Sequence, residues 1–209
     1  MILLVKEKKV AAESKSKIDI HVKQFPKAYW KYLLVTALFG IGNSSNSFLI
    51  LQIKDKGLSL IMTVLIYAMF NLVVAAISYP AGYLSDKFGR KPLLLISFII
   101  FFISYTGFAF SLHIFLIGVL FVFYGLFQGI FRSVGKSYAA DFVPQQLRAS
   151  GVGWYSTIVG LSGLIASVAG QLWDKVSHAA VFIYGAVLSL IGIIALLIFV
   201  SNKQHAGSK

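Results

Sequence analysis

Long runs without a charged residue recur along this chain. A helix that crosses the hydrocarbon core of a bilayer needs about 20 consecutive, mostly apolar residues. Six runs of about that length contain no Asp, Glu, Lys or Arg: residues 32–51, 59–79, 93–110, 114–131, 151–172 and 179–200. Buried helices of a large soluble protein would need amphipathic partner helices, which the chain lacks. We therefore expect an all-α polytopic membrane protein with six transmembrane helices.

The composition supports a membrane location. Of the 209 residues, 58% are hydrophobic and only 12% are charged, whereas about 25% of the residues in soluble domains are charged. Such a chain cannot cover a soluble surface with polar side chains. It also contains no cysteine, which excludes disulfides, thiolate metal sites and cysteine nucleophiles. We expect no cofactor and no bound metal.

The basic residues are unevenly distributed between the two sides of the membrane. The net charge is +12, with 19 Lys and Arg against 7 Asp and Glu. If the six runs alternate across the bilayer, sixteen basic residues fall on one side and three, Lys54, Lys56 and Lys175, on the other. Basic loops mark the cytoplasmic side, so we expect both termini in the cytoplasm and the protein in the plasma (inner) membrane. This asymmetry explains the positive net charge of a protein whose partner is the lipid bilayer. Binding to nucleic acid is not needed to explain it.

Domain boundaries follow from the same pattern. Residues 1–27 are expected to form a basic cytoplasmic linker, residues 28–202 the six-helix bundle, and residues 203–209 a cytoplasmic tail. Within the linker, the apolar residues 1–5 precede the first lysines, whereas a signal peptide has its positive charge before the apolar run. They resemble the end of a preceding helix.

Amides and phenols are concentrated in the first, second and fourth predicted helices. Polar side chains inside a bilayer usually face other helices or a cavity. We expect these three helices to line a shared polar cavity for a small-molecule substrate; the alternative is that the amides only hold helices together. The third and sixth helices have no Asn or Gln and are expected to face lipid. The pocket candidates are Asn43, Asn46, Tyr67, Asn71, Tyr124 and Gln128.

The sequence predicts no ionisable residue in the middle of a span. Arg132 and Lys136 follow the fourth run, where their long side chains can extend to the cytoplasmic interface. Neutral pocket groups do not favour a highly charged solute. Small residues recur at four-residue spacing, which predicts close helix packing: Gly125 and Gly129, Ser156 and Gly160, Gly163 and Ser167, Ala166 and Gly170, and Gly185 and Ser189.

The loop between the second and third helices has a distinctive sequence. Residues 82–91 are Gly-Tyr-Leu-Ser-Asp-Lys-Phe-Gly-Arg-Lys, followed by Pro92. Gly82 permits close helix contact, Gly89 permits a tight turn, and Pro92 suits the first turn of a helix. Membrane topology explains the positive charge of this loop. It does not explain two glycines spaced around Asp86.

This loop resembles motif A of the major facilitator superfamily, roughly G-x-L-(A/S)-D-(R/K)-x-G-R-(R/K). Residues 141–148, followed by Gly151, are similar to the superfamily's linker between the fourth and fifth helices. The resemblance covers about residues 28–202 and is to the C-terminal half of such a transporter. The motif residues that match are Gly82, Leu84, Ser85, Asp86, Lys87, Gly89, Arg90 and Lys91.

The resemblance implies a six-helix half built from two inverted three-helix repeats. It implies transport of a small solute by alternating access. The expected partner is an N-terminal six-helix half encoded elsewhere, or a second copy of this chain through self-association. It further implies that Asp86, Arg90 and Asp141 form a cytoplasmic charge network that locks one access state. The gating motif then comprises Gly82, Asp86, Gly89, Arg90, Lys91, Asp141 and Arg148.

Two alternative functions compete with transport. A chain of this length could be a non-transporting assembly partner or a remnant of a transporter. More remotely, Gly160-Leu161-Ser162-Gly163 resembles the serine motif of rhomboid intramembrane proteases. Such a serine needs a histidine within hydrogen-bond reach, and His178 is expected about half a bilayer away. We therefore expect no catalytic residue and no enzyme.

Overall fold

The computed structural model describes residues 24–43, 46–55, 57–111, 113–166 and 169–200. The predicted tail and nearly all of the predicted linker, including residues 1–5, lie outside these residues, as does Ser167. All regular elements in the described part are helices: α1 (Lys27–Gly42), α2 (Asn46–Asp55), α3 (Leu60–Phe88), α4 (Arg90–Phe110), α5 (Ile114–Asp141), a short 3₁₀ turn η2 (Gln145–Leu147), α6 (Arg148–Ala166), α7 (Ala169–Lys175) and α8 (His178–Phe199). They make six stretches long and apolar enough to cross a membrane. The all-α prediction with six spans is confirmed.

The spans differ from the charge-free runs in two ways. The first span consists of two helices, α1 and α2, and the fifth consists of α6 and α7. In addition, α3 and α5 continue well beyond the apolar runs, for 29 and 28 residues. At 1.5 Å per residue, each is about 42 Å long and exceeds the ~30 Å hydrocarbon core. As a result Arg132 lies inside α5, nine residues before its last residue, and its expected position at the helix end is wrong.

The six spans pack as two groups of three. The first group is α1–α2, α3 and α4, and the second is α5, α6–α7 and α8. The packing of α3 against α5 corresponds to the packing of α1 against α6. The packing of α4 against α5 corresponds to that of α1 against α8. Helices α4 and α8 also pack against each other. Exchanging the two groups reproduces this set of contacts. This is the relation that two inverted three-helix repeats predict.

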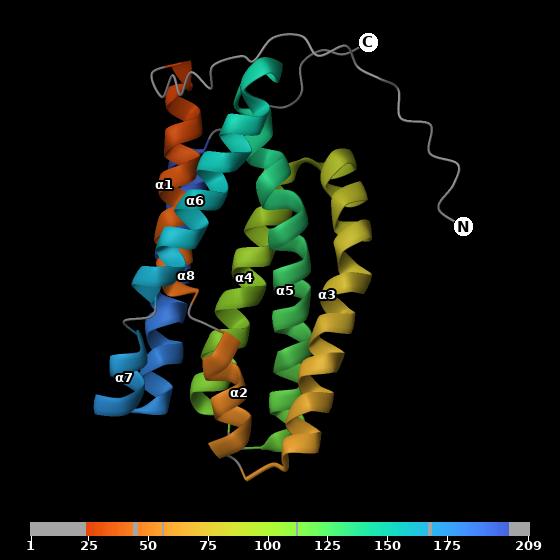
Figure 1. Ribbon diagram of the computed structural model, residues 1–209, viewed down its shortest axis with the longest axis vertical. Coiled ribbons are helices and arrows are strands. Elements are labelled where there is room, and N and C mark those ends of the chain that lie inside the picture. The colour runs from red at the N-terminus through yellow and green to blue at the C-terminus, as the bar shows by residue number, and fades with distance from the viewer. Residues whose placement is uncertain (1–23, 44–45, 56, 112, 167–168, 201–209) are drawn as a thin grey trace, which may run out of the picture.

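The bundle has two ends, which Figure 1 shows at the top and bottom. We call the end where α3 turns into α4, and where α5 leads to α6, the Arg90 end. The opposite end, where α2 leads to α3 and α7 leads to α8, is the Asp55 end. At the Asp55 end, serine side chains cap two helices: Ser59 accepts from the N–H of Met62, and Ser177 accepts from the N–H of Ala180. Such caps satisfy N–H groups that have no partner within the helix.

Aromatic rings fill the centre of the bundle. The rings of Phe39 on α1 and Phe98 on α4 stack with centroids 3.8 Å apart. Buried hydroxyls join helices through backbone carbonyls: Tyr32 Oη donates to the carbonyl of Gly135, at 2.9 Å, and Ser189 Oγ donates to that of Phe98, at 3.1 Å. These bonds give the buried hydroxyls the partners that an apolar interior requires.

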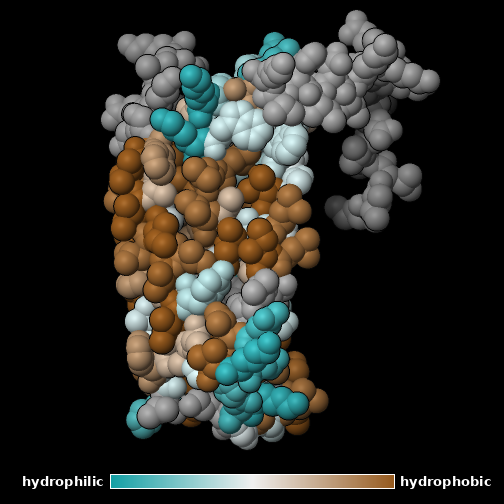
Figure 2. All heavy atoms as spheres, turned by 90° about the vertical axis from the view of Figure 1, so that its left-hand side faces the viewer, coloured by the Kyte–Doolittle hydropathy of each residue, from teal (hydrophilic) through white to brown (hydrophobic). Residues whose placement is uncertain are grey.

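Helices α4 and α8 present apolar side chains outward. Between the first turn and the last residue of α4, its exposed side chains include Ile96, Ile99 and Ile103. From Ile183 onward, every exposed side chain of α8 is likewise apolar. Figure 2 shows one face of the molecule, on which hydrophobic side chains cover the broad middle and hydrophilic ones lie towards the ends. These surfaces suit contact with lipid, as we predict for the third and sixth spans.

Glycines on two helices have different surroundings. On α5, a Cβ at Gly125 would lie 2.9 Å from Val73 Cγ1 of α3, and one at Gly129 would overlap Ile77. On α6, a Cβ at Gly160 or Gly163 would meet nothing within 4 Å. The close packing that small residues predict is therefore present along α5. At Gly160 and Gly163, which have no described neighbour, close packing stays a prediction.

Candidate functional site

The turn at the Arg90 end joins α3 directly to α4 through one residue. Gly89 has φ +95°, a left-handed conformation that favours glycine, and its N–H donates to the carbonyl of Ser85 at 3.0 Å. Helix α4 begins at the next residue, Arg90, with Pro92 in its first turn. The turn and the position of Pro92 agree with the sequence-based expectations.

The Arg90 guanidinium connects this turn to the end of α5. Its Nη1 lies 2.8 Å from Asp141 Oδ1 and also donates to the carbonyl of Ser137, while Nη2 lies 3.4 Å from Asp86 Oδ1. The exposed fractions of the Arg90 and Asp141 side chains are 21% and 23%, against 70% for Asp86. A cation in the first turn of a helix is disfavoured by the helix dipole, and the two carboxylates offset this effect. The three charged residues that the motif implicated do lie together, and we call them the Arg90 clamp.

Other residues of the motif are not part of these contacts. A Cβ at Gly82 would meet nothing within 4 Å, so the expected close helix contact at Gly82 is wrong within the described chain. Lys91 lies in the first turn of α4 and is partly buried, and Arg148 begins α6 and is exposed. The described ion pairs of Arg90 involve only Asp86 and Asp141.

A second polar cluster lies where α1 ends and α2 begins. Tyr124 of α5 donates its hydroxyl to Asn46 Oδ1 at 2.7 Å and lies 3.4 Å from Asn43 Oδ1. Asn43 follows the last residue of α1, and Asn46 is the first residue of α2. The structure thus brings together three of the predicted pocket residues, from the first and fourth spans, at the interruption of the first span.

The second span contributes through aromatic contacts. The Tyr67 ring stacks on Phe70, with centroids 5.5 Å apart, and Phe70 stacks on Tyr124 at 5.4 Å. Asn71, in contrast, is exposed and donates its amide to the carbonyl of Tyr67 on its own helix, at 2.8 Å. Tyr67 is therefore linked to the cluster through Phe70. Asn71 has no described bond to the cluster.

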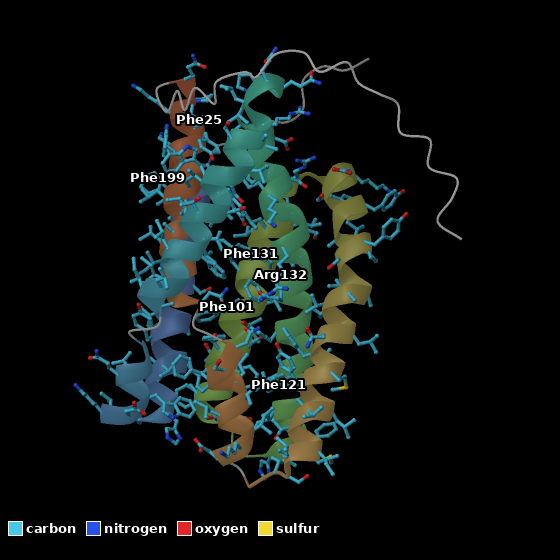
Figure 3. The ribbon with its side chains drawn as sticks, in the orientation of Figure 1. Phe25, Phe101, Phe121, Phe131, Arg132 and Phe199 are labelled. Carbon is cyan, nitrogen blue, oxygen red and sulfur yellow. The ribbon has the colours of Figure 1, made fainter. Side chains whose placement is uncertain are left out.

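Gln128 and Arg132 extend the polar face of α5. They follow Tyr124 at successive four-residue steps, so all three lie along one side of the helix. Gln128 is only 7% exposed, and its Oε1 has no hydrogen-bond partner among the described residues. Arg132 is exposed, and Figure 3 shows it at about mid-height of the bundle. Arg132 is the nineteenth of the 28 residues of α5, so it lies closer to the end of the helix than its middle does. The expectation that no ionisable residue lies in the middle of a span stays a prediction.

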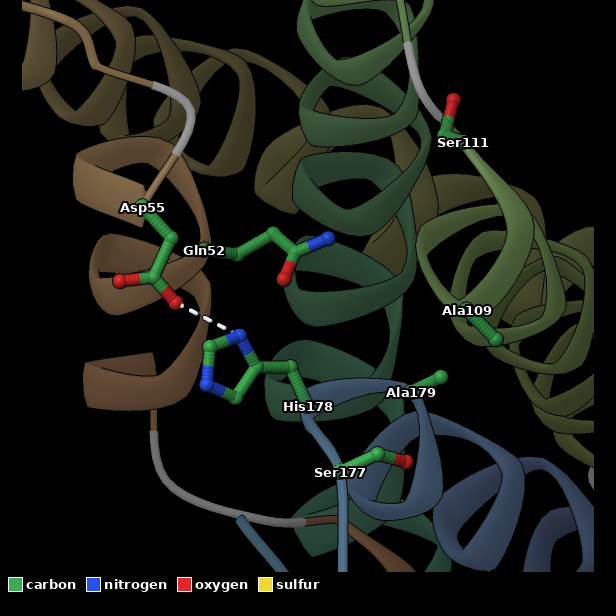
Figure 4. A pocket seen from close by; sticks show the side chains of 7 residues that line it. All are labelled: Gln52, Asp55, Ala109, Ser111, Ser177, His178 and Ala179. Carbon is green, nitrogen blue, oxygen red and sulfur yellow. Dashed lines mark ion pairs between the residues drawn. The ribbon is translucent and has the colours of Figure 1, made fainter. Parts of the chain in front are cut away.

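A hollow of about 640 Å³ opens at the Asp55 end. His178 Nδ1 lies 2.8 Å from Asp55 Oδ2, and Gln52 and Ser111 also line the space, which Figure 4 shows. The Trp173 ring stacks on His178 with centroids 4.1 Å apart. Asp55 is the last residue of α2, and its side chain is 37% exposed. No group of three His, Asp or Glu that could hold a metal occurs among the described residues.

The serine of the rhomboid-like motif packs in a different region. Ser162 is buried, and its side chain packs on Gly40, where a Cβ would lie only 2.7 Å from Ser162 Cβ. His178 is paired with Asp55 at the start of α8. This arrangement gives the serine no described histidine partner.

Comparison with known proteins places these features in a family. The model of the Major Facilitator Superfamily matches residues 32–209. The chain belongs to the major facilitator superfamily. It is accordingly a multi-pass membrane protein of a transporter family rather than of an enzyme family.

Three relatives illustrate the range of this family. The chain is 35% identical over 203 residues to an "Uncharacterized MFS-type transporter" of Methanocaldococcus jannaschii, covering 94% of the chain and 51% of the relative. It is 30% identical over 139 residues to "Tetracycline resistance protein, class H" of Pasteurella multocida, covering 66% and 34%. It is 26% identical over 154 residues to "Quinolone resistance protein NorA" of Staphylococcus aureus, covering 74% and 40%. The chain spans about half the length of the archaeal relative.

Proposed function

We propose that the chain is the C-terminal six-helix half of a secondary transporter that moves a small solute by alternating access. The Arg90 end and both termini lie in the cytoplasm, and the Asp55 end faces outward from the plasma membrane. The observation that carries this proposal is the Arg90 clamp, which ties the α3–α4 turn of the first group of helices to α5 of the second.

The clamp lies within this six-helix half, and we infer that it acts as a latch because its contacts change when the half moves against the second half. Its stronger element is the contact of Arg90 with Asp141, which is short and mostly shielded from water. The contact with Asp86 is longer, and that carboxylate is largely exposed, so by itself it contributes about 0–1 kcal/mol. A difference of 1.4 kcal/mol between two access states changes their population ratio about tenfold. Loss of the Asp141 contact is therefore sufficient to shift the balance.

A second bundle is needed to complete the transport path. Large side chains of α3 and α6 are exposed among the described residues, including Leu72 and Leu161, and the transport cavity of such a protein lies between two six-helix halves. Polar groups left facing lipid would cost several kcal/mol each. We therefore propose that an N-terminal six-helix half packs on α3 and α6, with a second copy of this chain as the competing arrangement. A non-transporting assembly role is an outcome that the experiment below distinguishes.

The experiment measures which side of the membrane has access to the polar cluster. The chain contains no cysteine, so Asn43→Cys introduces a single thiol for a membrane-impermeant maleimide. In the assembled protein with the clamp intact, labelling should come from the Asp55 side. Adding Asp141→Asn should move labelling towards the Arg90 side, whereas the matched control Asp174→Asn, on exposed α7, should leave it unchanged. If Asp141→Asn left the side of labelling unchanged, the result would contradict alternating access controlled by the clamp.

Solute transport is the companion measurement. Tetracycline and a quinolone, the compounds in the names of two relatives, are the first solutes to test, with uptake driven by a pH gradient in liposomes. The two halves together should support uptake that neither half supports alone. If the two halves assemble but the side from which Asn43→Cys is labelled never changes, the result would favour the non-transporting role.

A further inference from the structure

Arg132 is an unusual residue because its charge lies within a membrane-spanning helix. It occurs 18 residues after the start of α5 and nine before its end, about 13 Å along the axis from that end. The Arg90 clamp contacts α5 at Ser137 and Asp141, both nearer the end of the helix than Arg132. Arg132 therefore lies farther from this end of the span than the clamp, and an unpaired charge within a span is costly and usually functional.

The Arg132 side chain extends deeper into the bundle rather than towards the surface. Side chains of a helix point towards its N-terminus, and the N-terminus of α5 is at the Asp55 end. Figure 3 shows Arg132 between the heights of Phe131 and Phe121. No hydrogen bond or carboxylate partner of Arg132 occurs among the described residues.

The direction of Arg132 around α5 places it on the cavity face. With 3.6 residues per turn, Arg132 projects about 80° around the helix from Tyr124, and Gly129 about 140°. Tyr124 points to Asn43 and Asn46 at the α1–α2 junction, and Gly129 packs on α3. Arg132 therefore projects between α3 and the α1–α2 junction, in the sector that the two polar spans enclose.

Gln128 lies one turn from both Tyr124 and Arg132, but it is only 7% exposed and its Oε1 is buried. Gln128 therefore belongs to the packed interior of this half rather than to the surface that a solute reaches. Arg132, in contrast, is exposed.

We propose that Arg132 selects solutes that carry an anionic group, such as a carboxylate or sulfonate. This inference rests on the proposed transport function, of which it names the solute class. It replaces the sequence-based expectation of a pocket that is unsuited to a charged solute. The guanidinium is well suited to this role because its planar donors match the geometry of a carboxylate.

The first test measures the electrostatic potential in the cavity without needing the natural solute. Asn43→Cys in the assembled protein is reacted with an anionic and a cationic methanethiosulfonate reagent of similar size. With Arg132 present, the anionic reagent should be favoured, and Arg132→Gln should lower the anionic-to-cationic rate ratio about tenfold or more. Arg132→Lys should retain most of the preference. Lys136→Gln, one turn nearer the Arg90 end and also exposed, is the matched control and should change the ratio far less.

The second test uses a pair of solutes that differ in charge, 2-naphthoate and 2-naphthamide. Naphthoate should slow the labelling of Asn43→Cys at a concentration about tenfold lower than naphthamide, and Arg132→Gln should make the two equal. Equal protection with Arg132 present, an unchanged reagent ratio in Arg132→Gln, an equal effect of Lys136→Gln, or no reaction with either reagent would overturn the proposal. A clear charge preference without any change in sidedness after Asp141→Asn would instead contradict only the transport mechanism.

Discussion

Helices α5 and α6 both carry pairs of glycines at short spacing, but the two pairs have different surroundings. Gly125 and Gly129 of α5 allow α3 to approach so closely that its Val73 and Ile77 occupy the space of a side chain. Gly160 and Gly163 of α6 have no described neighbour within 4 Å of a Cβ. Small residues in membrane helices stabilise a protein only where another backbone packs on them. The difference agrees with the proposal that a second bundle packs on α6.

Helix α3 shows the same contrast between its own two sides. Phe70 is buried against α5, whereas Leu72 and Tyr79 are 69% and 84% exposed. One side of α3 is therefore part of the core, and the other is available for a second bundle. Helices α4 and α8 also expose aliphatic side chains, which suit contact with lipid.

The largest expected effect is at the closed packing surface of α5. Gly129→Val would place methyl groups into Ile77 and the carbonyl of Val74, and we expect it to lower the free energy of unfolding by about 3 kcal/mol or more. Unfolding in mixed detergent micelles measures this effect. The matched change on the open surface, Gly163→Val, should lower it by less than about 0.5 kcal/mol. Equal losses in the two variants would remove the distinction between the surfaces.

The open surface of α6 should matter for assembly rather than for stability. Gly163→Val should weaken association with the N-terminal half by about tenfold, or 1.4 kcal/mol, because it fills a site that a neighbouring backbone would occupy. Fluorescence energy transfer between the two halves in nanodiscs measures this association. Ile194→Ala, on the exposed side of α8, is the control and should leave association unchanged. A normal affinity for Gly163→Val would place the interface elsewhere.

Within the Arg90 clamp, we expect the two carboxylates to contribute unequally. Asp141→Asn should shift the ratio of the two access states about tenfold, whereas Asp86→Asn should shift it about threefold or less, because Asp86 is mostly solvated and farther from Arg90. The sidedness of labelling at Asn43→Cys reports both shifts. A larger effect of Asp86→Asn would mean that the motif carboxylate, rather than the end of α5, holds Arg90.

The smallest expected effect is at the Asp55 end. The pair of Asp55 with His178 is exposed, and such pairs contribute about 0–1 kcal/mol. Asp55→Asn should therefore disturb transport and stability less than Asp86→Asn does. Side-by-side uptake and unfolding measurements test the ranking. If Asp55→Asn were the more damaging change, the hollow at this end would be part of the transport path.

The sequence was sufficient for features set by local composition and spacing. Charge-free runs identified the six spans, and the depth of Asn43, Asn46 and Tyr124 along their spans predicted that they would meet. The contact between Arg90 and Asp141, 51 positions apart, was available only through the family resemblance, since spacing alone does not relate two distant helix ends. The polar run Gly42-Asn43-Ser44-Ser45-Asn46 is typical of a helix interruption. The prediction of a single helix over residues 32–51 overlooked this run.

The errors have a common physical cause. The length of a charge-free run is not the length of a helix, and α5 therefore continues past Arg132 to Asp141. Similarly, an amide or a glycine in a span does not reveal which of its sides has a neighbour. The Asn71 amide donates a hydrogen bond to the Tyr67 carbonyl on its own helix. A Cβ at Gly82 would meet no described atom within 4 Å, where a helix contact was expected.

The central claim is that this chain is one half of a transporter and cannot transport alone. The most direct test is to purify the chain, reconstitute it in liposomes, and measure its oligomeric mass together with solute uptake under a pH gradient. We predict no uptake by a monomer, because one bundle provides one wall of the cavity and has no second bundle to move against. Adding the N-terminal half should restore uptake. A monomer with robust gradient-driven uptake would contradict the account.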